Sequence, residues 1–277
     1  MSQASYLGFQ PGTTFIHKLN GTTKLIAFLS LSLITMISYD IRFLTLVGII
    51  SLCLFIKADV SWRSIKVPVY LVIVFASLNL LTIYLFAPEQ GVEIFGSRNV
   101  IWEGIGRYTL TWEQLIYEAN ILLKYFTTIP LAFIFILTTN PSEFASSLNR
   151  IGLSYRISYA VSLTLRYIPD IQQEFYDIKQ SQQARGIEMS NKAPILDRLK
   201  HTAGIVLPII FNSLDRIEVV SNAMELRRFG KGKQRTWYRY KPFSRLDIVC
   251  IIIVFLLVLL GIMMLILNGS RFYNPMA

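Results

Sequence analysis

Long runs of uncharged, apolar residues recur along the chain and predict membrane-spanning helices. Residues 67–87 and 248–268 are such runs, and residues 119–139 form a third with Lys124 near one end. A helix needs about 20 residues of this kind to cross about 30 Å of hydrocarbon. Two shorter runs, 25–39 and 43–56, flank a break at residues 40–42 and predict a hairpin of short helices. The pattern therefore predicts five transmembrane helices.

The composition supports an all-α, polytopic membrane protein. The chain has 277 residues, of which 53% are hydrophobic and 16% are charged, and its mean hydropathy is +0.48. Soluble domains carry about 25% charged residues. The two cysteines, Cys53 and Cys250, lie inside apolar runs, so a disulfide-rich secreted scaffold is excluded. Disorder is excluded because disordered chains are poor in aromatic and branched aliphatic residues.

The distribution of charge predicts the topology. The net charge is +10, and residues 140–247 alone carry seventeen Lys or Arg against ten Asp or Glu. The link 57–66 is also basic, whereas the loop 88–118 is acidic. Because cytoplasmic loops of membrane proteins are rich in Lys and Arg, we expect the N-terminus and residues 140–247 in the cytoplasm. The positive charge then reflects topology, and no nucleic acid partner is expected.

This topology divides the chain into three parts. Residues 1–139 form an N-terminal membrane domain with four spans, and residues 140–247 form a cytoplasmic domain of amphipathic helices. Residues 248–277 form the last transmembrane helix and a tail. The acidic loop 88–118 has no predicted role.

The cytoplasmic part contains two similar helical segments. After a short helix from Asn140 that breaks at Gly152, an amphipathic helix is predicted from Pro169 to the sequence Ala184-Arg185-Gly186. Gly186 fits the left-handed position that follows a helix C-terminus. A second segment runs on from Pro208 to the sequence Leu226-Arg227-Arg228. Each segment therefore places an arginine at the C-terminal end of a long helix.

An arginine at such a position has two interpretations. It complements the helix dipole and offers a planar fork for a carboxylate on a partner protein. Alternatively, cytoplasmic helix ends are basic because of the dipole and the positive-inside rule alone.

Several motifs together resemble the transmembrane T component of energy-coupling factor (ECF) transporters, which import vitamins and other micronutrients into prokaryotes. The signature is the pair of X-Arg-X motifs centred on Arg185 and Arg227, although Leu226 and Arg228 replace the usual alanine and glycine in the second. The other matching segments are Pro11-Gly12, His17-Lys18-Leu19, Thr23-Lys24-Leu25, Thr138-Thr139-Asn140-Pro141, Leu148-Asn149-Arg150-Ile151-Gly152-Leu153 and Leu165-Arg166-Tyr167-Ile168-Pro169.

The resemblance implies a coupling subunit of the prokaryotic cell membrane that has no catalytic activity of its own. The two arginine motifs are expected to dock on two cytoplasmic ABC-type ATPases, which bind ATP and Mg; the docking residues would be Ala184, Arg185, Gly186, Leu226, Arg227 and Arg228. An apolar surface is expected to hold a small membrane-embedded substrate-binding S protein. Its contact residues would be Ile205, Ile209, Leu214, Ile217 and Val220, unless these side chains pack inside the protein itself.

Other classes of function find little support in the sequence. No Gly-x-x-x-x-Gly-Lys-Ser/Thr loop occurs, so the chain is expected to bind no nucleotide or other cofactor. His17 and His201 are far apart and lack further ligands at metal-binding spacing, so no metal site is expected. The alternative to the coupling subunit is a self-sufficient secondary transporter or channel, which needs polar groups at midplane. A membrane enzyme is disfavoured because no carboxylate, histidine or cysteine cluster is present.

Overall fold

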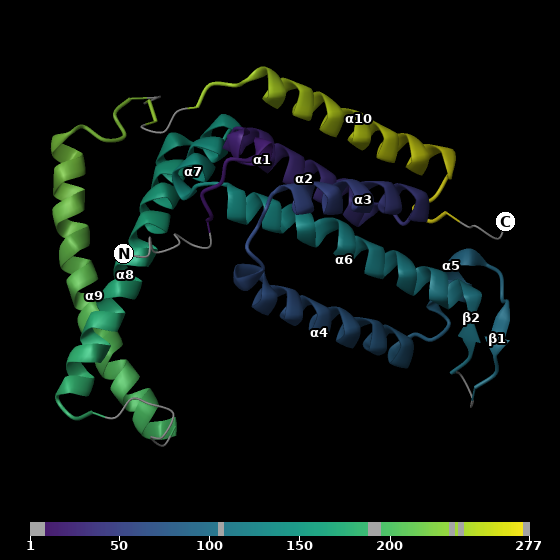
Figure 1. Cartoon of the computed structure of the whole chain (residues 1–277), viewed down its shortest axis with the longest axis horizontal. Helices are drawn as coiled ribbons and strands as arrows, with labels where there is room; N and C mark the ends of the chain where they lie inside the picture. Colours follow the sequence, from purple (N-terminus) through teal and green to yellow (C-terminus); the bar gives the residue numbers. More distant parts are fainter. Residues whose placement is uncertain (1–8, 105–107, 188–194, 233–235, 238–240, 274–277) are drawn as a thin grey trace. The chain divides into compact units, whose positions relative to one another are not determined.

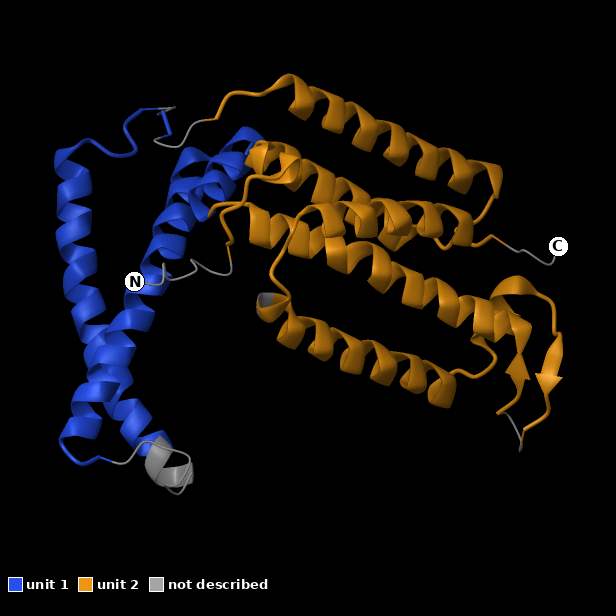
Figure 2. Ribbon diagram, viewed as in Figure 1, with its two compact units in different colours: residues 1–7, 141–240 blue, residues 8–140, 241–277 orange. Residues whose placement is uncertain are grey.

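The chain folds into two compact units in a computed structural model that describes residues 9–104, 108–187, 195–232, 236–237 and 241–273. The arm unit comprises residues 1–7 and 141–240, and the bundle unit comprises residues 8–140 and 241–277 (Figure 2). The first eight residues of the predicted N-terminal domain and the last four of the predicted tail lie outside the described residues. The arm unit is thus an insertion between two parts of the bundle unit.

The bundle unit consists mainly of helices (Figure 1). Its elements are α1 (Phe15–Lys18), α2 (Gly21–Ile37), α3 (Ile41–Lys57), α4 (Trp62–Phe86), α5 (Gln90–Phe95), β1 (Val100–Trp102), β2 (Leu110–Thr111), α6 (Trp112–Thr138) and α10 (Arg245–Leu267). Within the described residues, Ile65–Phe86 of α4, α6 and α10 are long and apolar enough to cross a membrane, and α2 is a shorter apolar helix. The predicted all-α, multi-pass fold is confirmed.

Two sequence predictions in this unit differ from the structure. Helix α6 begins at Trp112, whereas hydropathy placed its start at residue 119. The added turns are polar, and they are helical because the Thr111 side chain caps them by accepting a hydrogen bond from the Gln114 backbone. The acidic loop 88–118 also contains α5 and the antiparallel pair β1–β2.

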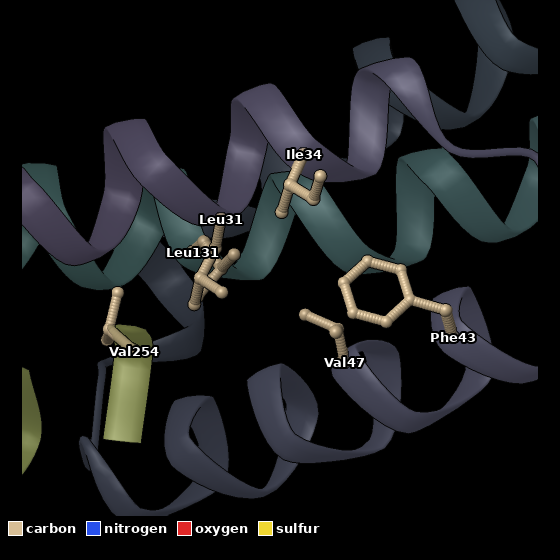
Figure 3. Packing of buried hydrophobic residues seen from close by; sticks show 6 residues of the cluster. All are labelled: Leu31, Ile34, Phe43, Val47, Leu131 and Val254. Atoms are coloured by element: carbon tan, nitrogen blue, oxygen red, sulfur yellow. The ribbon is translucent and has the colours of Figure 1, made fainter. Parts of the chain in front are cut away.

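Helix α6 lies at the centre of the bundle and packs on α2, α3, α4 and α5. The largest buried cluster joins four helices (Figure 3). Its members are Leu31 and Ile34 of α2, Phe43 and Val47 of α3, Leu131 of α6 and Val254 of α10. Helix α10 approaches closely at Gly261, where an added Cβ would lie 2.7 Å from Ile34 Cγ1 and 2.8 Å from Phe43 Cζ. The core therefore requires glycine at this position.

A buried polar cluster ties the first turn of α2 to the start of α10. The Asp247 carboxylate accepts hydrogen bonds from the Asn20 backbone (2.8 Å), the Thr23 hydroxyl (3.0 Å) and both the backbone and hydroxyl of Ser244 (2.8 Å each). The Asn20 side chain donates to the Lys241 carbonyl (2.6 Å). Four donors on one carboxylate make a fully buried charge tolerable.

The same turn of α2 also holds the end of α6. Lys24 is buried, and its ammonium donates a hydrogen bond to the Thr138 carbonyl (2.7 Å). We call Asn20, Thr23, Lys24 and Asp247 together the α2 clamp. It joins the two places where the chain leaves and re-enters the bundle unit.

The other end of α2 is fixed by Asp40. Its carboxylate accepts hydrogen bonds from the Arg42 guanidinium (3.0 and 2.8 Å) and from the Asn268 side chain (2.9 Å). Burial raises the pKa of Asp40, but the hydrogen bonds from Arg42 and Asn268 outweigh it and leave the pKa below its ordinary value. The segment after α10 is thereby held to the α2–α3 turn.

The described part of the arm unit contains three helices: α7 (Pro141–Arg150), α8 (Tyr155–Ala184) and α9 (Ile195–Leu226). The predicted break is confirmed, because Gly152 has a positive φ of 110°. The prediction that the long helices begin at Pro169 and Pro208 is wrong, since both prolines lie inside continuous helices of 30 and 32 residues. A proline removes one backbone hydrogen bond, which helices this long accommodate at a local cost of about 3 kcal/mol.

We predict that Asp247→Ala destabilises the bundle unit by about 2–4 kcal/mol, because it leaves buried donors unpaired and removes the Asp247 half of the capping box that begins α10. Thermal unfolding in mild detergent measures the effect. Asp215→Ala, at an exposed position of α9, is the control and should change stability little. Equal unfolding temperatures for the two variants would contradict the role assigned to the clamp.

Candidate functional site

The first arginine motif is the C-terminal cap of α8. The Gly186 backbone N–H donates to the Gln183 carbonyl (3.0 Å), and the Ile187 N–H donates to the Gln182 carbonyl (3.2 Å). With Gly186 at φ +85°, this is the hydrogen-bond pattern of a Schellman motif. Arg185 is the C-cap residue and is exposed. The predicted left-handed Gly186 is confirmed.

The second arginine motif has the same geometry at the end of α9. The Arg228 N–H donates to the Glu225 carbonyl (2.9 Å), and the Phe229 N–H donates to the Met224 carbonyl (2.9 Å). Arg227 therefore occupies the same C-cap position as Arg185, and it is also exposed. Arg228 takes the place of glycine with φ +53°. A side chain in this region costs about 1–2 kcal/mol.

An apolar residue after each cap anchors it to the rest of the arm unit. Ile187 packs on the buried pair Ile205 and Ile209. Phe229 packs against the rings of Tyr155 and Tyr159, with centroids 5.6 and 4.7 Å away. Both arginines are thus held on ordered backbone at the ends of long helices.

Additional contacts hold the second cap. The Arg156 guanidinium donates to the Gly230 carbonyl (2.9 Å), and the Trp237 ring lies 5.4 Å from that of Tyr155. The start of α8 is therefore bound to the end of α9. These contacts offset part of the strain at Arg228.

Polar side chains join α8 and α9 midway along each helix. Glu174 accepts a hydrogen bond from the Asn212 side chain (2.8 Å) and forms an ion pair with Arg216 (3.5 Å). The Arg216 guanidinium also lies 5.7 Å from the centroid of the Tyr167 ring. Sequence reasoning missed this contact. The signal available in the sequence was a pair of residues of opposite charge, Glu174 on α8 and Arg216 on α9, each with apolar residues one helical turn away.

Two apolar crevices lie between α8 and α9 beside this polar contact. One has a volume of about 360 Å³ and is lined by Tyr167, Val220 and Met224, among others. The second, of about 690 Å³, is lined by residues that include Phe175 and Leu214. Ile217 lines both.

The five residues predicted to contact an S protein fall into two groups. Leu214 and Ile217 are 54% and 63% exposed, and Val220 is half-buried at the edge of a crevice. Ile205 and Ile209 are buried and pack with Phe175, Ile178 and Ile187. The burial of Ile205 and Ile209 assigns them to packing between α8 and α9, so only the first group offers an accessible surface.

The described residues contain no group of three or more His, Cys, Asp or Glu side chains that could hold a metal ion. Of the two histidines considered as ligands, His17 is bound locally, with Nδ1 2.7 Å from the Thr14 hydroxyl and Nε2 3.1 Å from the Gln10 carbonyl. A carbonyl only accepts, so Nε2 carries the proton. Burial and the nearby charge of Lys24 lower the pKa of His17, and the ring serves the local structure.

Comparison with known proteins gives a consistent family assignment. Residues 12–238 match the family model CbiQ, described as cobalt transport protein. Three relatives are named energy-coupling factor transporter transmembrane protein EcfT. That of Exiguobacterium sibiricum is 25% identical and covers 94% of this chain and 97% of its own. That of Bacillus subtilis is 24% identical, with coverages of 83% and 86%, and that of Heliobacterium modesticaldum is 29% identical, with 84% and 86%.

We predict that Gly186→Ala loosens the first cap. An added Cβ meets nothing within 4 Å, so the substitution introduces only the strain of a positive φ, about 1 kcal/mol. Hydrogen exchange of the backbone around residue 186 should become about fivefold faster. Gly204→Ala, also without a steric contact but inside α9, should slow exchange locally. If Gly186→Ala also slows hydrogen exchange, as Gly204→Ala should, the cap geometry assigned to Gly186 is wrong.

Proposed function

Because the chain belongs to the CbiQ family and is an EcfT-like transmembrane component of energy-coupling factor transporters, we propose that it couples a pair of ABC-type ATPases to a membrane-embedded S protein. In this role the chain transmits motion and has no catalytic residue. ATP and Mg bind to the partner ATPases. The transported substrate is a vitamin or another micronutrient.

The observation that carries this proposal is the identical placement of Arg185 and Arg227. Each is the exposed C-cap residue of a helix of 30 or more residues, and each is followed by an apolar anchor. The last carbonyls of a helix give its end a partial negative charge, which favours a cation there. A guanidinium at this position can form strong bidentate hydrogen bonds with a carboxylate of a partner protein. The chain has two such helix ends, which is one for each of the two ATPases.

The flanking residues contribute to docking in different ways. Ala184 and Gly186 leave space around Arg185, so an ATPase groove can close on it. Leu226 is 87% exposed and offers apolar contact beside Arg227, and Arg228 adds a second charge. The two ends therefore present different surfaces, which suits two ATPases that differ from each other.

The S protein is proposed to bind along the crevices between α8 and α9. Leu214, Ile217 and Val220 supply an apolar surface there, and the crevices are open on one side, where a helix of the S protein can pack. The bundle unit anchors the complex in the cell membrane of a prokaryote. The positive-inside rule puts the N-terminus and residues 140–247 in the cytoplasm, on the side of the ATPases.

We predict that Arg185→Glu and Arg227→Glu each reduce ATP-driven uptake by the reconstituted transporter at least about tenfold, because each replaces an ion pair with repulsion. The double variant should lose more. Co-purification with the ATPases, followed by uptake in proteoliposomes, measures the two steps separately.

Lys231→Glu is a matched control, since it changes the same charge at an exposed position four residues after Arg227. It should leave uptake within about twofold of the unmodified transporter. Full uptake by the double variant would refute the docking role. Solute transport by the chain alone in proteoliposomes would instead favour the secondary transporter or channel.

A further inference from the structure

The segment between α4 and α6 forms a small lobe at one end of the bundle unit. Two of its carboxylates, those of Glu89 and Glu113, are bound within the lobe. Glu113 is buried and accepts hydrogen bonds from the Ser97 hydroxyl (2.9 Å) and from the backbone (3.1 Å) and side chain (2.9 Å) of Asn99. Glu89 forms an ion pair with Arg98 (2.9 Å). Glu89 and Glu113 of this acidic loop therefore serve internal contacts of the lobe.

The lobe is fixed to the first turn of α6. The Gly91 backbone N–H donates to the Gln114 side chain (3.0 Å), and the backbones approach so closely that a Cβ on Gly91 would lie 2.4 Å from the Glu113 carbonyl. The Trp112 N–H donates to the Asn99 carbonyl (3.1 Å). The lobe thus has a defined position relative to the helix end.

The strand β1 exposes apolar side chains on both of its faces. Val100, Ile101 and Trp102 are all exposed, Trp102 by 64%. Successive residues of a strand point to opposite faces, so neither face is covered. An exposed apolar surface of this kind is stabilised when it is removed from water.

The depth of the hairpin is set by the membrane-spanning helices. The Tyr108 ring lies 6.3 Å from that of Tyr84, in the last turn of α4, and the hydrogen bond of Trp112 holds Asn99, next to β1, at the first residue of α6. The 22 residues Ile65–Phe86 span about 33 Å, so their ends reach the edge of a hydrocarbon layer of about 30 Å. In Figure 1 the two strands run across the direction of α4 and α6.

We propose that the exposed edge of the hairpin, formed by Val100, Ile101, Trp102 and Tyr108, binds the phospholipid bilayer at the membrane–water interface. Tyr108 of this edge contacts Tyr84 of α4, and few residues of the membrane-spanning part of α4 are buried. Trp and Tyr favour this depth because their rings are apolar and their polar groups reach water. The strands then lie along the membrane surface and hold the connected ends of α4 and α6 at one level. This inference is independent of the proposed function.

A nitroxide label at residue 101 tests the proposal. The variant Ile101→Cys is made in a Cys53→Ser, Cys250→Ser background, and the full chain is placed in nanodiscs of phosphatidylcholine and phosphatidylglycerol. Collision rates with oxygen, which enters lipid, and with a water-soluble nickel chelate are measured by electron paramagnetic resonance. We expect a several-fold excess of oxygen over nickel collisions at residue 101. Glu93→Cys, at an exposed position of the same lobe, is the control and should show the reverse.

Equal values at residues 101 and 93 would overturn the proposal. Low collision rates with both reagents at residue 101 would also overturn it, because they indicate contact with protein. A second measurement leaves the strand unchanged. With Trp62, Trp112 and Trp237 replaced by Phe, the emission of Trp102 should be quenched several-fold more by lipids with brominated tails than by aqueous iodide. Stronger quenching by iodide contradicts lipid contact.

Discussion

The first turn of α2 holds together the two points between which the arm unit is inserted. Asp247, 227 residues after Asn20, accepts its backbone hydrogen bond, while Lys24 binds the carbonyl of Thr138. A buried charge that loses its partners has a high desolvation cost, so the clamp favours one arrangement of these segments. The clamp therefore fixes, within the bundle unit, the two segments between which the arm unit is inserted.

Hydropathy alone predicted most of the bundle unit, because membrane-spanning helices depend on local composition. It could not predict the clamp, since Asn20 and Asp247 meet only through the packing of α10 on α2. The starts of α6 and of the arm helices were misplaced for a different reason. Polar first turns carry no hydropathy signal, and the effect of Pro169 or Pro208 depends on how much helix lies on both sides.

The arginine positions were predictable because a C-cap is a local structure with its own sequence signature. Gly186 identifies the first cap in the sequence. The second cap has Arg228 in place of glycine, and only the φ of +53° at Arg228 shows that the two caps are equivalent. The sequence could not predict which of the five apolar residues expected to contact an S protein are buried and which are exposed. Ile205 and Leu214 look alike in the sequence, yet one packs inside and the other is exposed, because the crossing of α8 and α9 decides which turns meet.

The internal proline of each long helix in the arm unit lies at a different distance from the arginine at the end of that helix. Arg185 and Arg227 lie 16 and 19 residues beyond Pro169 and Pro208, which corresponds to lever arms of about 24 and 28 Å. Each proline removes a hydrogen bond and so marks the most compliant point of its helix. A bend of roughly 10° at that point moves the arginine by about 4–5 Å. Because the segment from Pro208 to Arg227 is longer than that from Pro169 to Arg185, an equal bend at each proline displaces Arg227 further than Arg185.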